Sequence, residues 1–266
     1  MKKATPAIYL RSGLFYLLFV TFTIVWCSML IVVLPLMPRH RRFAFGIGIF
    51  TRTVMRLVSF CCGIHWDVWG EENIPSDPCV LYAKHQSTWE TFFLQTLFSP
   101  QSQVIKKELL SVPFFGWAFR LLGPIAIDRN DKRRATTQVV EKGSEKLQEG
   151  YWILIFPEGT RVDPGHQKRF THGGARLAQA AGHPLLPIAH NAGEFWPNNH
   201  FVKFPGRIQL VIGAPIASDN RSVEALTAAG EEWINQTVSA IAGGGQLSPE
   251  QAAELTKPQK IDPNLG

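Results

Sequence analysis

The feature that most constrains this chain is an uncharged run near its N-terminus. None of Asp, Glu, Lys or Arg occurs from Ser12 to Pro38. From Leu14 to Leu34 the residues are apolar apart from threonines and one serine. Because about 20 such residues span a bilayer, the run predicts a transmembrane helix at about 13-36.

A secretory signal peptide is the main alternative, because Lys2, Lys3 and Arg11 form a basic segment before the run. However, the run is long for the apolar core of a signal peptide, and no small-x-small cleavage site follows it. The basic cluster at 39-42 places more positive charge after the helix than before it. The positive-inside rule therefore favours an inner or cell membrane location with the folded domain in the cytoplasm.

A second apolar stretch, from Phe43 to Ile64, carries Arg52 and Arg56 one turn apart on one helical face. This pattern is typical of an amphipathic helix that lies in the membrane interface, here at about 43-63. The alternative is an ordinary helix packed on the folded domain. Under either interpretation, residues 1-64 form an N-terminal membrane anchor.

The rest of the chain alternates apolar strand segments with helical segments, an order that predicts a single α/β domain at 65-242 with a mostly apolar central sheet. Beyond residue 242 the composition turns to Gly, Pro, Gln, Glu and Lys, which predicts a mobile tail at 243-266. The predicted strands lie at 64-69, 80-83, 103-105, 125-129, 151-156, 185-189 and 208-212, the last of them at a sheet edge, and the predicted helices at 92-98, 131-148 and 223-241.

The charge and composition narrow the choice of partner. A formal charge of +6 and a pI near 9.3 suit nucleic acid, a membrane surface or a phosphorylated substrate. Eight tryptophans and eighteen phenylalanines beside the apolar N-terminus favour the membrane over nucleic acid. The four cysteines have no C-x-x-C spacing, so neither a disulfide framework nor a zinc site is predicted.

The segment Lys-His-Gln-Ser-Thr-Trp-Glu at 84-90 lies between a predicted strand and a predicted helix, where catalytic groups collect in α/β folds. His85 and Glu90 are five residues apart and cannot share one face of a helix. They can meet across a turn if Ser87 caps the helix and Glu90 lies in its first turn. Glu90 would then orient His85 as a general base. The alternative is a capping box of Ser87 and Glu90 that performs no chemistry.

The segment Phe-Pro-Glu-Gly-Thr-Arg at 156-161 leaves a strand that is predicted to be covered on both faces. Proline ends the hydrogen bonding of the strand, and glycine lets the backbone approach a ligand closely. Arginine offers a planar fork that suits a phosphate. The alternative is a simple turn that carries a solvated arginine.

In type and order, these segments resemble the motifs of the glycerolipid acyltransferase family that includes the 1-acyl-sn-glycerol-3-phosphate acyltransferases. The resemblance covers about 66-215, with the four motifs at 85-90, 123-129, 156-161 and 186-188. The chain departs from the family pattern at two positions. Glu90 stands where the family has an aspartate, and Lys84 stands where an asparagine commonly precedes the histidine.

The resemblance implies transfer of a fatty acyl group from acyl-CoA or acyl carrier protein to the free hydroxyl of lysophosphatidic acid, which gives phosphatidic acid. His85 is the expected general base and Glu90 the residue that orients it. Direct transfer needs no serine or cysteine nucleophile, and no metal or cofactor is expected. The residues predicted to bind or organise the substrate phosphate are Arg161, Arg129, Gly159, Thr160, Glu158, Lys106 and Lys107.

Three other functions remain open from the sequence. The acceptor can be another lysophospholipid or a lyso amino-acid lipid. A serine esterase that uses His85 as its base is disfavoured, because no serine lies in a G-x-S-x-G elbow. A lipid-binding membrane protein without catalytic activity is the third alternative, and Glu90 in place of aspartate is the feature that keeps it open.

Overall fold

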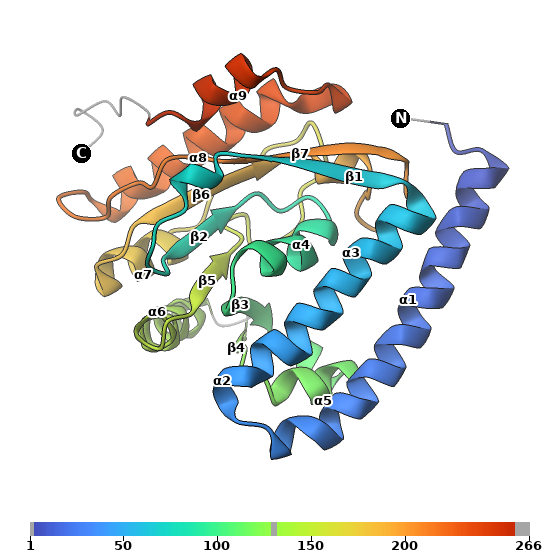
Figure 1. Cartoon of the computed structure of the whole chain (residues 1–266). Coiled ribbons are helices and arrows are strands. Elements are labelled where there is room, and N and C mark those ends of the chain that lie inside the picture. Colours follow the sequence, from blue (N-terminus) through green and yellow to red (C-terminus); the bar gives the residue numbers. More distant parts are fainter. Residues whose placement is uncertain (1–2, 129–131, 259–266) are drawn as a thin grey trace.

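A seven-stranded sheet forms the centre of the molecule in the computed structural model, which describes residues 3-128 and 132-258 (Figure 1). The strand order is β1-β7-β6-β2-β5-β3-β4, and every neighbouring pair is parallel except β6 and β7. The strands are β1 (Ile64–Trp69), β2 (Val80–Ala83), β3 (Gln101–Lys106), β4 (Ile125–Ile127), β5 (Trp152–Ile155), β6 (Leu185–His190) and β7 (Gly206–Ile212).

Helices cover both faces of this sheet. The helices are α1 (Pro6–Val33), α2 (Arg39–Arg42), α3 (Ile49–Cys62), α4 (Trp89–Leu97), α5 (Phe115–Arg120), α6 (Lys132–Gln148), α7 (Gly173–Ala181), α8 (Val223–Ala240) and α9 (Pro249–Thr256). In β2, Leu81 and Ala83 pack with α1, α3 and α4, whereas Val80 and Tyr82 pack with α6, α7 and α8. Because alternate side chains of a strand point to opposite faces, both faces of β2 are apolar, which confirms the predicted α/β class.

Strand β7 is an interior strand, so its predicted edge position is wrong. It pairs with β1 on one side and with β6 on the other, and β1 forms the edge instead. Residues 208-212 of β7 are all buried. The physical reason is the pairing of β1, an earlier segment of the chain, along the outside of β7, and no local pattern in β7 shows that long-range pairing.

The predicted mobile tail is wrong for residues 249-256, which form helix α9. Ser248 and Gln251 make a capping box at its start. The helix is held to the domain because Trp233 Nε1 donates to the Leu255 carbonyl (3.1 Å) and Asn73 Nδ2 donates to the Thr256 carbonyl (2.8 Å). Residues 259-266 of the predicted tail lie outside the described residues.

Helix α1 packs lengthwise against the domain (Figure 1). Near its start, Arg11 Nε donates to the Cys61 carbonyl (2.7 Å), and further along, Trp26 Nε1 donates to the Gly46 carbonyl (3.0 Å). Between them Phe15 is fully buried. By length and composition, the helical stretches Pro6–Leu36 and Arg39–Cys62 can each cross a membrane. The opposite face of α1 exposes large apolar side chains, among them Leu10, Leu14, Leu17, Val20, Ile24, Val25 and Val32.

A buried lysine fastens α1 to the loop before β7. Lys203 Nζ donates to the Tyr16 hydroxyl (2.7 Å) and lies 4.1 Å from the centre of that ring and 4.9 Å from the Trp196 ring. Burial lowers the pKa of Lys203 to about 8. Among the described residues no carboxylate pairs with this ammonium group, and the aromatic rings stabilise it instead.

Helix α3 places its apolar face inward. Val54, Met55 and Val58 are buried against the sheet and α4, whereas Arg52 and Arg56 face outward. The buried face is what the alternative of a helix packed on the domain predicts. The location of its outer face in a membrane interface stays a prediction.

Candidate active site

His85 lies in the loop between β2 and α4, and Glu90 lies in the first turn of α4. His85 Nδ1 is 2.8 Å from Glu90 Oε1. The same carboxylate oxygen accepts the backbone N–H groups of Gln86 (3.0 Å) and Ser87 (2.9 Å). The turn therefore brings the two predicted catalytic side chains together, and the backbone fixes the carboxylate in place.

Ser87 is not the N-cap that the sequence suggested. The N-cap position is Thr88, whose side chain makes no capping bond. Ser87 Oγ instead accepts the Trp89 N–H (3.1 Å) and donates to the Trp196 carbonyl (2.6 Å). Glu90 accepts the Ser87 N–H, as the acidic residue of a capping box does, and it also holds His85. The same carboxylate therefore fits both the catalytic and the capping interpretation.

Glu90 is held in its ionised form. Burial acts to raise its pKa, but the nearby His190, the hydrogen bond from His85 and the Ser87 N–H outweigh burial, and the pKa is lowered. Because an ionised carboxylate only accepts hydrogen bonds, Nδ1 of His85 carries a proton and Nε2 carries the lone pair. The ring of Phe156 stacks on His85 with the ring centres 3.8 Å apart. The imidazole is thus oriented to act as a base through Nε2.

A buried ion pair supports this loop from behind. Lys84 Nζ is 2.5 Å from Glu158 Oε1, and both side chains are almost fully buried. Glu158 Oε2 also accepts the backbone N–H of His85 (3.2 Å). Burial raises the pKa of Glu158, and the Lys84 ammonium offsets part of that rise. Glu158, predicted near the substrate phosphate, therefore holds the backbone of His85 and does not line the pocket described below.

A second histidine, which belongs to none of the motifs found in the sequence, completes the support. His190, fully buried at the end of β6, donates from Nε2 to the Lys84 carbonyl (2.9 Å) and accepts the Ala192 N–H at Nδ1 (3.2 Å). Its Nε2 is 3.9 Å from Glu90 Oε2. Burial lowers the pKa of His190. Both ring nitrogens are used by the backbone in the neutral form, so His190 fastens the backbone of Lys84, next to His85, to the end of β6.

A pocket of about 410 Å³ opens beside His85. Its polar wall includes Thr160, Arg161 and Lys106, and much of the remaining wall is aromatic. Arg161 Nε donates to the Ser87 carbonyl (2.8 Å), which ties the loop after β5 to the loop of His85. Among residues 3-128 and 132-258, the two terminal amino groups of Arg161 have no hydrogen-bond partner. The aromatic and apolar residues of the wall include Phe50, Phe92, Leu109, Phe115, Phe119 and Phe156.

The other residues predicted for phosphate binding lie in different surroundings. Lys107 is 2.5 Å from Asp128 in an exposed ion pair and does not line the pocket. Gly159 has a φ of +70°, which favours glycine, and forms the turn that carries Thr160 and Arg161. Arg129 lies outside the described residues. Contact with a phosphate stays a prediction for all seven residues.

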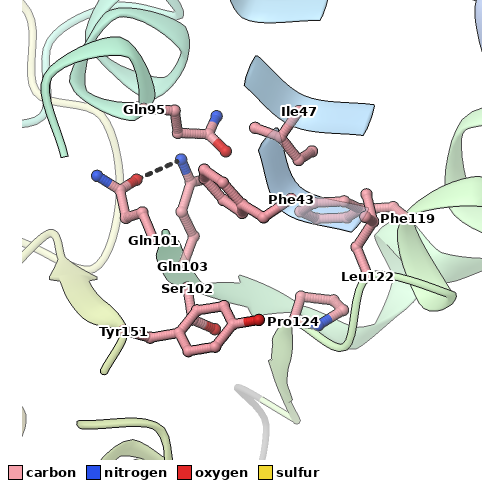
Figure 2. A pocket seen from close by; sticks show the side chains of 10 residues that line it. All are labelled: Phe43, Ile47, Gln95, Gln101, Ser102, Gln103, Phe119, Leu122, Pro124 and Tyr151. Carbon is pink, nitrogen blue, oxygen red and sulfur yellow. Dashed lines mark hydrogen bonds between the residues drawn. The ribbon is translucent and has the colours of Figure 1, made fainter. Parts of the chain in front are cut away.

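A smaller cavity of about 10 Å³ shares four lining residues with this pocket, Ile47, Gln95, Gln103 and Phe119 (Figure 2). Gln95 and Gln103 each donate to the Thr91 carbonyl (2.7 and 2.8 Å). Gln103 also donates to Gln101 Oε1 (3.3 Å), as Figure 2 shows. The wall that the two cavities share therefore includes polar side chains from α4 and β3.

Comparison with known proteins places this geometry in a family. Residues 65-191 match the model of the Acyltransferase family. The chain is 46% identical over 235 residues to a 1-acyl-sn-glycerol-3-phosphate acyltransferase of Pseudomonas aeruginosa, covering 87% of this chain and 91% of the relative. A protein of the same description from Saccharomyces cerevisiae is 30% identical over 219 residues, covering 80% and 72% of the two chains.

A crystal structure of the 1-acyl-sn-glycerophosphate acyltransferase from Thermotoga maritima has the same fold. The TM-score is 0.75 at 23% identity, with 90% of this chain and 97% of that chain covered. The fold and the family predicted from the sequence motifs are thereby confirmed. The chain is an acyltransferase and belongs to the family that contains the 1-acyl-sn-glycerol-3-phosphate acyltransferases.

Proposed function

We propose that this acyltransferase moves a fatty acyl group from acyl-CoA or acyl carrier protein to the free hydroxyl of 1-acyl-sn-glycerol 3-phosphate and so forms phosphatidic acid. The observation that carries the proposal is that His85, Arg161 and Lys106 line one pocket whose remaining wall is largely apolar. An amphiphilic acceptor needs a base, a cationic group and an apolar surface in such an arrangement. The descriptions of the relatives support the same substrate.

The reaction follows from the orientation of His85. Its Nε2 removes the proton of the acceptor hydroxyl while the hydroxyl oxygen attacks the carbonyl carbon of the thioester. The tetrahedral intermediate then expels the thiolate, and the imidazolium returns the proton to the sulfur, so an ester and a free thiol are formed. Glu90 stabilises the imidazolium through Nδ1. A positioned general base contributes about 10²–10⁴ in rate.

Arg161 is assigned to the phosphate of the acceptor. Replacing Arg161 with alanine should raise KM for lysophosphatidic acid by about 10- to 150-fold, because a charge-assisted hydrogen bond contributes about 1.5–3 kcal/mol. KM for the thioester should barely change. Arg161→Lys should recover only part of the loss, since lysine restores the charge without the planar fork. Initial rates at varied acceptor and donor concentrations measure both constants.

The acceptor provides the control for this assignment. Lysophosphatidylcholine has a phosphate diester with less charge, so Arg161→Ala should affect its use less. Lys142→Ala removes an exposed cation of α6 that lies outside the pocket and should leave KM for lysophosphatidic acid unchanged. Equal losses with both acceptors, or a change of KM confined to the thioester, would contradict the assignment and favour another acceptor.

We also propose that the exposed face of α1 attaches the enzyme to the membrane, with the domain on the cytoplasmic side. All large hydrophobic side chains that the described residues expose lie in α1, in η1 (Leu34–Leu36), in α3, between 109 and 117, or at Phe201. Because α1 packs along the domain, a transmembrane orientation of α1 would place Arg52 and Arg56 of α3 near the hydrocarbon core. Each arginine there costs about 2.5–3.5 kcal/mol. This cost favours insertion of the exposed face into one leaflet.

The triple substitution Leu10→Ser, Leu14→Ser and Leu17→Ser should release the enzyme from neutral phosphatidylcholine vesicles without unfolding it. Each of these leucines is exposed, and burying a leucine in lipid gains about 1.5–3 kcal/mol. Vesicle flotation measures the release. Phe15→Ser, on the buried face of the same helix, should lower the unfolding temperature instead. Undiminished flotation of the triple variant would show that the anchor lies elsewhere.

A further inference from the structure

A second groove lies on the outer side of α3, apart from the pocket at His85. Its volume is about 520 Å³, and its lining comes from α3, β1 and α4. The residues that carry the argument are Arg52, Arg56, Phe60 and Trp66. None of the groove residues lines the pocket of His85. That pocket is bordered by other residues of this region, Phe50 and Thr51 of α3 and Ile47 of the preceding η2 (Phe43–Gly48).

The groove is cationic and its cations are not neutralised. Arg52 and Arg56 are exposed, and neither makes a hydrogen bond or an ion pair with another described residue. Within the part of the chain that the structure describes, no carboxylate lines the groove. Like charges four residues apart destabilise a helix by a few tenths of a kcal/mol. The two guanidinium groups therefore offer an anion a site with complementary charge, and an anion between them would relieve their repulsion.

The groove also has an apolar wall. Phe60, one turn beyond Arg56, is 80% exposed. Trp66 of β1 and the buried Met55 lie beside it in the lining. A small inorganic anion would leave Phe60 in water, and a soluble acidic surface would gain little from it. An anionic group joined to an apolar chain matches both parts of the groove.

The position of the groove indicates which class of amphiphile it binds. Helix α3 lies beside α1 (Figure 1). Leu10, Leu14 and Leu17 of α1 are exposed. If α1 enters one leaflet, Arg52 and Arg56 have to lie at the level of the lipid phosphates, because guanidinium groups avoid the hydrocarbon core. We propose that this groove binds the phosphate headgroup of an anionic membrane phospholipid, with the start of an acyl chain against Phe60. The inference rests on the membrane attachment proposed above.

Flotation with two vesicle compositions tests this site. The enzyme should bind vesicles of phosphatidylcholine with phosphatidylglycerol more tightly than vesicles of phosphatidylcholine alone. Arg52→Gln with Arg56→Gln should reduce binding to the anionic vesicles by about 25-fold, since each arginine near an anionic surface contributes a factor of about 5. Binding of the double variant to neutral vesicles should not change. Phe60→Ser should weaken binding to the anionic vesicles with the arginines intact.

A charge-matched variant separates a site from a general charge effect. Lys142→Gln with Arg176→Gln removes two exposed cations from α6 and α7, on the far side of the domain from α1 (Figure 1), and should keep the anionic preference. An equal loss in this control would show non-specific attraction and overturn the proposal. The proposal would also be overturned if the wild-type enzyme bound neutral and anionic vesicles equally well. That result would not contradict the membrane attachment by α1. Loss of binding to neutral vesicles by the α3 variant would assign the arginines to the anchor itself.

The remaining alternative occupant is an acidic carrier protein. In that case the α3 variant would keep its preference for anionic vesicles and lose kcat/KM only with a carrier-bound acyl donor, with acyl-CoA unaffected. That result would overturn the lipid site.

Discussion

Replacing His85 with alanine should lower kcat by about 10²–10⁴-fold while the protein stays folded. His85 is mostly buried, its Nδ1 is fixed by Glu90 and its ring is stacked on Phe156, so no other group replaces Nε2 at this position. The loss should appear in kcat, because the alanine variant keeps Arg161 and the apolar wall that bind the substrates. Release of free thiol from acyl-CoA, measured with and without lysophosphatidic acid, gives the rate.

Variants of Glu90 act as graded controls for this result. Glu90→Gln keeps the shape of the side chain and loses the charge that stabilises the imidazolium, so the loss should be smaller than for His85→Ala. Glu90→Asp tests the length of the acid, since Glu90 Oε1 accepts from His85 and from two backbone N–H groups at once. A His85→Ala variant with near-wild-type turnover would rule out the general-base mechanism and leave lipid binding as the role of this site.

Much of the α/β fold was predictable because buried strands carry a local signal. Strands covered on both faces are continuous apolar runs, and 80-83, 151-156 and 185-189 have this pattern. The order of the strands has no such signal. β5 pairs with β2, and β7 lies between β1 and β6, because distant segments match each other in shape and burial. For that reason β7 was assigned to the wrong position in the sheet.

Helix α9 was missed for a related reason. Its polar composition resembles a solvated tail, and its attachment depends on Asn73 and Trp233, which lie far away in the sequence. The capping box at Ser248 was a local sign of the helix.

The candidate site also has one part that local sequence predicts and another that depends on long-range contacts. The meeting of His85 and Glu90 follows from a turn of five residues, so spacing alone was enough to suggest it. The contacts of Lys84 with Glu158 and with His190 join residues 74 and 106 positions apart. They depend on the placement of β5 and β6 on either side of β2, which only the folded sheet shows. Lys84 was visible in the sequence as a departure from the family pattern, but its partner was not.

Replacing Lys84 with methionine should lower the free energy of unfolding by about 3–5 kcal/mol, because it leaves the carboxylate of Glu158 buried without a cation. At roughly 2–4 °C per kcal/mol for a chain of this size, the unfolding temperature should fall by about 6–20 °C. Thermal unfolding in detergent, followed by circular dichroism, measures the change.

A double variant shows whether the loss comes from the ion pair. Glu158→Gln removes the buried charge, and its amide oxygen can still accept the His85 N–H that Glu158 Oε2 now accepts. Lys84→Met combined with Glu158→Gln should therefore recover most of the stability lost by Lys84→Met alone, because replacing both members of a buried pair is often close to neutral. If the two losses simply add, Lys84 and Glu158 are not coupled, and the loop of His85 has to be held chiefly by His190 and the contacts of Glu90.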